Sequence, residues 1–217
     1  MKVGLLALGL AAFFGSGGAA QAHPHIFIEA RSELVFDQAG RITAVRNIWQ
    51  FDKAYTAFLV QGLDKNRDGK LSAEELQPMA KTNVEALASY EFFTYLTIDG
   101  KPAGFLPPSD YGLASVDGGG LILTFVLPLK APSPGRGTSN LVVFDRDYFV
   151  AITYGKENQL KLIGAPAACK SLFQPPQYPG DTIMSMLSVI PPEEHDLPPD
   201  LAAPVTAMAN SFQVSCP

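Results

Sequence analysis

Alternating hydrophobic and polar residues dominate the chain and predict many short β-strands. Segments 25–37 and 42–52 alternate in this way, and a short connection joins them as a hairpin. Turns rich in Gly and Pro separate further strands, which are expected at 92–99, 109–116, 120–129, 140–145, 148–154, 160–164 and 211–216. A Pro-rich, acidic segment at 174–204 carries one short helical pattern at 181–190. This many short strands is typical of an antiparallel β-sandwich.

A helical pattern interrupts the strands at about 53–90. Tyr55 and Phe58 belong to an apolar face that recurs at helical spacing. Ser72, followed three residues later by Glu75, has the spacing of a capping box that opens a second helix. We therefore predict an α+β fold: an antiparallel β-sandwich-like domain with an inserted helix-loop-helix unit.

The residues that join the two predicted helices, 64–75 (DKNRDGKLSAEE), have the spacing of an EF-hand calcium loop. Ca²⁺ takes about seven oxygen ligands, which one tight turn of this kind can supply. Gly69 stands where the loop turns most sharply. The residues that would supply the oxygens are Asp64, Asn66, Asp68, Lys70 through its carbonyl, Ser72 through a water and Glu75.

No second loop of this kind occurs in the chain, and its charges nearly cancel. Lys65, Arg67 and Lys70 offset most of the loop carboxylates. A lone loop of low charge predicts weak binding, on the order of 10⁻⁴–10⁻³ M, as in extracellular modules. Such a calcium ion would be structural. The alternative is a loop that keeps this shape and binds no metal.

The first 22 residues have the features of a cleaved signal peptide. Lys2 provides a positive start, residues 3–14 form an apolar run, and Ala20-Gln21-Ala22 is a small-residue cleavage site. The apolar run is too short to span a bilayer. We therefore expect residues 23–217 to form a single exported domain, periplasmic in a bacterium and not membrane-spanning after cleavage.

Charge and cysteine content narrow the class of protein further. The net charge of −5 argues against nucleic acid as a partner and is compatible with divalent cations. The only two cysteines are Cys169 and Cys216, and an even pair in an oxidising compartment predicts a disulfide. Two buried free thiols are the alternative.

Cleavage after Ala22 would create a second candidate metal site, because the mature chain would begin His23-Pro24-His25. The α-amine and the imidazoles of His23 and His25 are nitrogen ligands that suit Zn²⁺, Cu²⁺, Ni²⁺ or Co²⁺. Pro24 has no amide proton, so the square-planar chelate built on backbone amides is excluded. The alternative is a processing junction whose histidines pack or hydrogen-bond. His195, the remaining histidine, lies in an acidic stretch that predicts a solvated loop.

Several motifs together resemble one bacterial periplasmic family, called domain of unknown function 1007 and described as the periplasmic component of an uncharacterised ABC-type transport system. They are HPHIFIEA, IWQFD, the calcium loop, GLILTFVLPLK, FDRDYFVAITY, GAPAAC and the terminal FQVSCP. The resemblance implies a role in transition-metal traffic of the nickel, cobalt or zinc type. Its implied partner is an inner-membrane metal permease or ABC transporter. In similar sequences a histidine often precedes the Trp of the IWQFD segment. This chain has Asn47-Ile48 there, so a third histidine ligand from that position is absent.

Enzyme motifs are missing from the sequence: it has no GxSxG, HExxH, CxxC or phosphate loop. We therefore expect a non-enzymatic, calcium-binding accessory protein of transition-metal transport. Two alternatives remain open. One is the solute-binding component of an ABC transporter, which should have two α/β lobes, and the other is a calcium-stabilised interaction module for a membrane partner.

Overall fold

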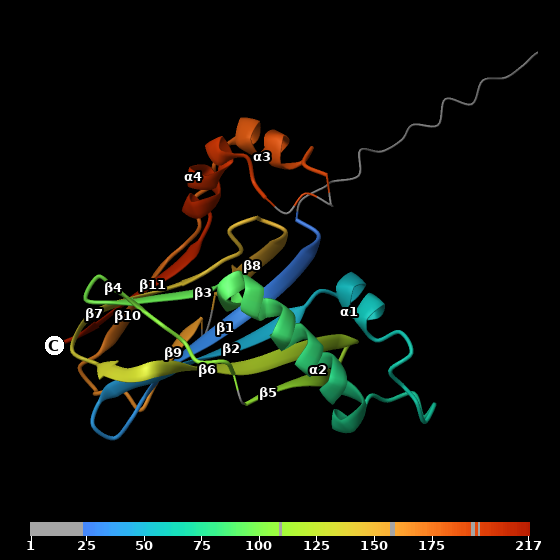
Figure 1. Ribbon diagram of the computed structural model, residues 1–217, viewed down its shortest axis with the longest axis horizontal. Helices are drawn as coiled ribbons and strands as arrows, with labels where there is room; N and C mark the ends of the chain where they lie inside the picture. Colours follow the sequence, from blue (N-terminus) through green and yellow to red (C-terminus); the bar gives the residue numbers. More distant parts are fainter. Residues whose placement is uncertain (1–23, 109, 157–158, 192–193, 195) are drawn as a thin grey trace, which may run out of the picture.

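Two β-sheets form the body of the protein in the computed structural model (Figure 1), which describes residues 24–217 except 109, 157–158, 192–193 and 195. One sheet has the order β5 (Tyr111–Val116), β6 (Gly120–Pro134), β2 (Arg41–Phe51), β1 (Ile26–Phe36) and β8 (Val150–Tyr154), with β9 (Leu160–Ile163) also paired to β1. The other has the order β10 (Lys170–Gln174), β11 (Asn210–Cys216), β7 (Gly137–Val143), β3 (Thr94–Ile98) and β4 (Lys101–Ala103). The predicted β-sandwich with helices is thus confirmed.

Most strand pairs in the described part of the chain are antiparallel, and the exceptions involve β1. The hairpin of β1 and β2 pairs Ile28 with Phe51 and Leu34 with Val45, as the sequence predicts. However, β8 and β9 both run parallel to the other edge of β1. Parallel neighbours need a long connection, and here one long route carries the chain from β2 to β8 through the helices and the second sheet. The first sheet is therefore mixed, not purely antiparallel.

The core lies between the two sheets and contains large apolar side chains from both. Trp49 of β2 is almost fully buried and packs edge-on against Phe125 of β6, with 4.8 Å between ring centroids. Leu141 and Phe212 close the core from the second sheet. Burying side chains of this size contributes about 2–3 kcal/mol each before entropy is counted.

A buried polar chain crosses this core. The Ser32 hydroxyl lies 2.7 Å from the Tyr154 hydroxyl and donates to the Asn47 amide oxygen at 2.8 Å. The Asn47 amide nitrogen donates to the Thr94 hydroxyl at 3.0 Å, which links the first sheet to the second. Burial raises the pKa of Tyr154 well above its usual value, so its hydroxyl stays protonated. Asn47 therefore has a structural role, because it joins the two sheets through its side-chain amide.

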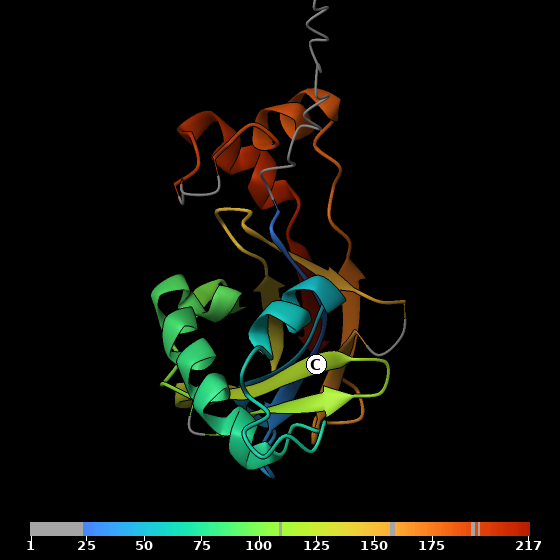
Figure 2. The same ribbon diagram turned by 90° about the vertical axis from the view of Figure 1, so that its right-hand side faces the viewer.

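Two helices cover the first sheet on one side, and Figure 2 shows them together below the other helical pair. They are α1 (Lys53–Leu59) and α2 (Ala73–Leu87), and a 3₁₀ helix, η1 (Ala88–Phe93), follows. Asp52 caps α1 by accepting from the backbone of Tyr55 at 2.9 Å, and also accepts from the backbone of Phe27 at 3.0 Å. These elements occupy the predicted helical insertion at about 53–90.

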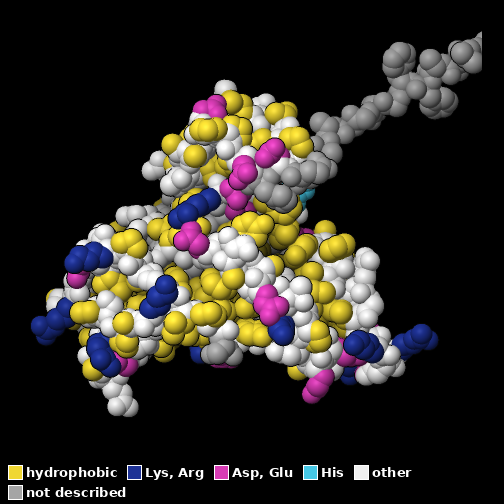
Figure 3. All heavy atoms as spheres, in the orientation of Figure 1, with side chains coloured by type: hydrophobic (Ala, Val, Ile, Leu, Met, Phe, Trp, Pro, Cys, Tyr) yellow, Lys and Arg dark blue, Asp and Glu magenta, His cyan; other side chains and the backbone are white. Residues whose placement is uncertain are grey.

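A second helical pair, α3 (Asp181–Leu187) and α4 (Pro199–Ala207), stands apart at the top of Figure 1. Its small core is separate from that of the sandwich and consists of Leu187, Ile190, Leu201 and Val205. The sequence predicts the first of these helices but not the second. Hydrophobic side chains remain visible on the face shown in Figure 3, both on this pair and on the sandwich below it.

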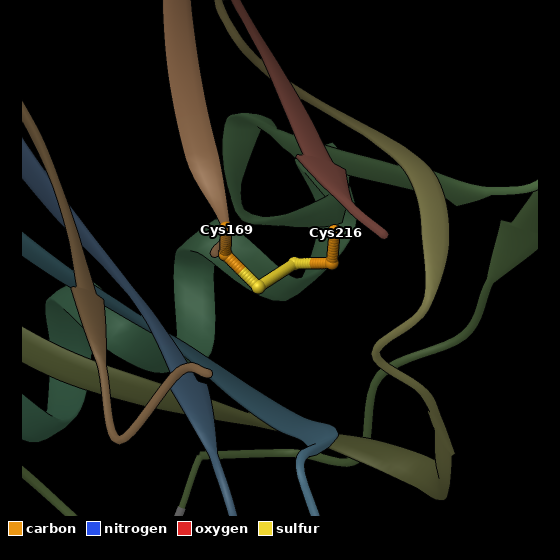
Figure 4. The surroundings of a disulfide bond; sticks show 2 residues. All are labelled: Cys169 and Cys216. Atoms are coloured by element: carbon orange, nitrogen blue, oxygen red, sulfur yellow. A yellow bond between two sulfur atoms is a disulfide. The ribbon is translucent and has the colours of Figure 1, made fainter. Parts of the chain in front are cut away.

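Cys169 and Cys216 form the predicted disulfide, which joins the start of β10 to the end of β11 (Figure 4). It spans 47 residues of sequence that include both α3 and α4. None of the described helices is both long and apolar enough to cross a membrane. The predicted signal peptide, residues 1–22, lies outside the described residues.

Candidate metal sites and an aromatic cavity

Residues 64–75 comprise the end of the connection between α1 and α2 and the first turn of α2, and their own backbone closes this loop with hydrogen bonds. Asp64 accepts from the backbone N–H of Asp68 at 3.2 Å and of Gly69 at 3.0 Å. Asn66 and Asp68 each accept from the N–H two residues on, at 2.9 and 2.8 Å. Gly69 has a φ of 79°, which glycine adopts without a steric penalty. The loop thus draws oxygen-bearing side chains onto one turn of backbone.

Glu75 closes the loop from the first turn of α2. One carboxylate oxygen accepts from the backbone N–H of Lys65 at 2.8 Å, and the other accepts from the N–H and the hydroxyl of Ser72, both at 3.0 Å. The Ser72 hydroxyl in turn accepts from the Glu75 N–H, so the predicted capping box is confirmed. Hydrogen bonds from the Ser72 and Lys65 backbone favour the charged carboxylate and lower the pKa of Glu75 to about 2.

The loop has the kinds of ligand that calcium prefers, but its side chains are not arranged as a calcium site in this structure. Carboxylate, amide, carbonyl and hydroxyl oxygens are the ligands that Ca²⁺ prefers, and each carboxylate has lone pairs beyond those used by one N–H. Yet no group of three or more His, Cys, Asp or Glu side chains among the described residues has an arrangement that could hold a metal ion. Glu75 is turned onto the backbone of Lys65 and Ser72. Ion binding would therefore require Glu75 to exchange at least one of these N–H groups for the cation.

His25 is the described member of the predicted N-terminal pair, since His23 lies outside the described residues, as does His195. The backbone N–H of His25 donates to the carbonyl of Phe149 at 2.9 Å, and the two rings lie 4.9 Å apart between centroids. This contact places the start of β1 beside the connection between β7 and β8. The structure therefore brings His25 to a specific partner segment, residues 144–149.

That connection is a turn organised by Asp145. The Asp145 carboxylate is buried and accepts from the backbone N–H of Asp147 at 3.0 Å and of Val150 at 2.9 Å. The N–H of Tyr148 bonds back to the Asp145 carbonyl at 3.2 Å, and Tyr148 itself has a φ of 55°. A non-glycine residue in this left-handed region costs roughly 1–3 kcal/mol. The surrounding fold must therefore hold this turn in place.

Arg146, in the same connection, contacts η1 and β3. The Arg146 guanidinium lies 2.8 Å from a carboxylate oxygen of Glu91 and 4.0 Å from the ring centroid of Tyr95. Both contacts are favourable for a cation. Burial raises the pKa of Tyr95 to about 12, so its ring remains a neutral phenol. Arg146 thus has partners of its own in η1 and β3.

An aromatic cavity of about 210 Å³ lies between the first sheet, the α1–α2 side and this connection. Its wall includes strand residues, residues of both helices and η1, and both carboxylates of the connection. Its lining residues include Ile26, Trp49, Phe51, Tyr55, Tyr90, Phe93, Leu123, Asp145, Asp147 and Phe149. Ala86 and Tyr90 are exposed as well as lining, so they mark the mouth.

Backbone strain is concentrated at the edge of this cavity. Glu91, Phe92 and Phe93 have successive φ values of 52°, 54° and 49°, at the end of η1. Phe93 is buried and stacks on Trp49 with 6.2 Å between ring centroids. With Tyr148, these residues make up four of the six described non-glycine residues with positive φ. Strain of this kind persists only where the rest of the structure enforces it.

The sequence matches the family described as "Protein of unknown function (DUF1007)" over residues 7–216. The chain belongs to this family. No curated protein matches it. Among solved structures, the crystal structure of AChBP from Bulinus truncatus is similar with a TM-score of 0.38 and 7% identity, over 90% of this chain and 87% of that chain. A similarity this low carries no inference about function.

In this DUF1007 chain, the sequence correctly predicts that the loop residues lie close together. It does not predict the aromatic cavity. Asp64, Asn66, Asp68, Ser72 and Glu75 all belong to one hydrogen-bonded turn, as their spacing predicts. The sequence pattern alone does not indicate a role for Asp145 and Asp147. The signal that could have found them is a pair of acids in FDRDYF between two apolar strands. Only the parallel pairing of β8 with β1 brings them into one cavity wall with Trp49.

Proposed function

We propose that this DUF1007 protein is an exported, non-enzymatic domain that binds one calcium ion in the loop at 64–75, as an EF-hand does. One observation carries the proposal. The side-chain oxygens of Asp64, Asn66 and Asp68 all accept hydrogen bonds from backbone N–H groups of the same short loop. Apart from Glu75, which must exchange a backbone partner for the ion, such a loop needs little further ordering, so less of the binding free energy is lost to entropy.

The ligands would be the side chains of Asp64, Asn66, Asp68 and Glu75, the carbonyl of Lys70, and a water held by Ser72. The ion would tie the end of α1 to the capped start of α2. Because α2 packs on the first sheet through buried Leu76, Ala80 and Val84, calcium would stabilise one side of the sandwich. Its role in this proposal is structural.

Calorimetric titration of Ca²⁺ into the mature protein tests this proposal. We expect one site with a dissociation constant on the order of 10⁻⁴–10⁻³ M. Glu75→Gln should weaken binding at least about tenfold, because it removes the bidentate carboxylate. Glu74→Gln is the matched control, since Glu74 is the neighbouring exposed acid at a position that supplies no ligand. Equal affinity in the two variants would refute the site.

We further propose that the mature N-terminus handles a transition metal, through the α-amine, His23 and His25, as an accessory to an inner-membrane metal permease or ABC transporter. Support comes from the nitrogen ligands of the His-Pro-His start. Further support is that His25 donates its backbone N–H to the Phe149 carbonyl. Phe149 belongs to the connection at 144–149, which also contains Asp145 and Asp147. The described residues form a sandwich and not two α/β lobes, which disfavours the alternative of a solute-binding component.

Titration of Zn²⁺, Cu²⁺, Ni²⁺ and Co²⁺ into protein that begins at His23 tests the second proposal. His25→Ala should weaken binding of at least one metal about tenfold or more. A protein with one extra residue before His23 should do the same, because its α-amine is displaced from the chelate. Ligation needs neutral histidine, so affinity should fall below about pH 6.5. Equal binding by all three proteins would refute this role.

A further inference from the structure

The aromatic cavity has the size and the wall of a site for one small ring. Its volume is about 210 Å³, and an apolar cavity of roughly 150 Å³ stays dry and binds benzene. The buried members of its wall are apolar and come from β1, β2, β6, β8 and η1: Ile28, Trp49, Phe51, Phe93, Leu123 and Val150. A benzene ring with one short substituent therefore fits among apolar side chains.

The amide and carboxylate side chains of the wall interact within the protein. The Asn83 amide nitrogen donates to the Met79 carbonyl at 2.9 Å. The Asp145 carboxylate accepts from the backbone N–H groups of Asp147 and Val150, and so holds the turn that it organises. The Asp147 side chain also interacts elsewhere in the protein. A charged ligand would lose its water shell on entering an apolar space whose polar groups are already engaged. The cavity therefore favours an uncharged occupant.

The rings of the wall stand in more than one orientation, which suits an aromatic guest. Trp49 and Phe93 are close to parallel, with 6.2 Å between ring centroids and 22° between ring planes. Phe51 and Tyr55 meet edge to face, with 5.2 Å between centroids. Aromatic rings attract one another in offset and edge-to-face arrangements, beyond what the buried area alone contributes. A saturated ring of the same size would gain the buried area only, so the wall should distinguish the two.

Phe93 enters the wall from a strained backbone segment. Its φ is 49°, and Glu91 and Phe92 before it have φ values of 52° and 54°. A left-handed conformation is unfavourable for bulky side chains and persists only where the surrounding structure enforces it. Such strain clusters at ligand sites, where it fixes the geometry of the wall. A relaxed segment would turn the Phe93 ring away from Trp49.

The cavity opens to solvent where α2 continues into η1. Tyr90 is 41% exposed, lines the cavity, and its ring lies 5.6 Å from that of Phe93 between centroids. Ala86 is exposed and lines the cavity as well. A small ligand can therefore enter past one aromatic and one small side chain without unfolding of the core.

We propose that this cavity is a binding site for a small uncharged aromatic molecule with a single ring. The ring lies among Phe51, Phe93 and Leu123, and a short polar substituent points to the mouth beside Tyr90. The described lining residues include no member of the loop at 64–75 and do not include His25. The site therefore stands or falls independently of both metals proposed above.

Trp49 is the only tryptophan in the chain and lines the cavity, so its fluorescence reports on binding directly. The probes are similar in size and differ in charge or in ring type: benzyl alcohol, cyclohexylmethanol, benzylammonium and benzoate. Each is titrated into the mature protein with EDTA present, which removes metal ions. We expect saturable binding of benzyl alcohol at millimolar concentrations and about three- to tenfold weaker binding of cyclohexylmethanol. The two ions should bind at least about tenfold more weakly than benzyl alcohol.

Two neighbouring alanines give matched variants that locate the site. Both are exposed, but Ala86 lines the cavity, whereas Ala88, at the start of η1, is not among its described lining residues. Ala86→Phe should weaken the binding of benzyl alcohol at least about tenfold, because the added ring occupies the space of the ligand. Ala86→Leu, with a smaller side chain, should give an intermediate loss, and Ala88→Phe should change nothing. Melting curves establish that the variants fold.

Three results would overturn the proposal. The first is that benzyl alcohol does not saturate at millimolar concentrations. The second is that either ion, or cyclohexylmethanol, binds as tightly as benzyl alcohol. The third is that Ala86→Phe and Ala88→Phe have the same effect on binding.

Discussion

The loop at 64–75 and the aromatic cavity differ in how far apart their residues lie in the chain. The loop is closed by hydrogen bonds between residues at most ten positions apart. The cavity takes its walls from β1, β2, β6, β8, α1, α2, η1 and the connection at 144–149, which only the folded sandwich brings together. The loop is therefore a local structure that the fold merely anchors, whereas the cavity is a property of the whole core. Perturbations of the core should affect the two regions unequally.

Removal of the disulfide is the perturbation with the largest expected effect. Cys169→Ala with Cys216→Ala opens a covalent link over 47 residues, and the chain-entropy relation gives a loss of about 4 kcal/mol. Urea unfolding followed by Trp49 fluorescence measures it. At low urea, where the variant is still folded, calcium affinity should stay within about twofold of the parent. A loss below about 1 kcal/mol would show that the linked strands are held by other contacts.

The buried polar chain tests the core without touching either region. Asn47→Ala removes two buried hydrogen bonds, one with the Ser32 hydroxyl and one with the Thr94 hydroxyl, and should cost about 2–3 kcal/mol. Ser32 keeps its contact with Tyr154, and Thr94 keeps its bond to the Phe92 carbonyl. Asn140→Ala is a milder control, since Asn140 accepts from Ser211 in a half-buried position. Urea unfolding compares them. If Asn140→Ala lowered the free energy of unfolding as much as Asn47→Ala, the hydrogen bonds that link the two sheets would contribute no more than an ordinary half-buried hydrogen bond.

The cap of α2 tests the local region. Ser72→Ala removes a hydroxyl that accepts from the Glu75 N–H and donates to its carboxylate, and should cost about 1 kcal/mol. Ser89→Ala, an exposed change in η1, serves as the control. A Ser72→Ala variant that loses calcium affinity but no stability would separate the metal role of Ser72 from its role as a cap.

Acid should weaken the loop through Glu75. Its pKa falls from 4.5 to about 2 on folding, so its contribution to stability is full above about pH 4.5 and is lost as pH falls towards 2. The melting temperature of the parent should therefore drop more steeply over this window than that of Glu75→Gln. Carbon-13 resonances of the Glu75 carboxyl give its pKa directly. A value near 4.5 would show that the Ser72 and Lys65 hydrogen bonds do not persist in solution.

The same contrast explains what the sequence could and could not predict. Ser72 and Glu75, or Asp64 and Gly69, reveal their roles by spacing alone, because the interacting groups are near neighbours. The hairpin of β1 and β2 is predictable for the same reason. The disulfide followed from the count of cysteines and the expected compartment, although its partners are far apart.

The elements that sequence reasoning missed have weak local patterns. β10 (Lys170–Gln174) is mostly exposed and lacks a clear alternation, and β4 is only three residues long. α4 contains Pro204 and lies in a Pro-rich segment that reads as a loop, yet Pro199 stands in its first turn, where proline is well tolerated. The parallel pairing of β8 with β1, which creates the cavity, leaves no mark in either strand alone.

The central claim, that the loop binds calcium locally, is tested most directly by amide NMR during a calcium titration. We expect saturable shifts of the Lys65 and Ser72 amides, because Glu75 exchanges these backbone partners for the ion. The Gly69 amide should shift as well, because its acceptor Asp64 becomes a ligand. The indole N–H of Trp49, a residue that lines the cavity, should stay within line width. In Glu75→Gln the shifts should require at least about tenfold more calcium. Amides that do not move at millimolar Ca²⁺, or that move equally in Glu75→Gln, would contradict it.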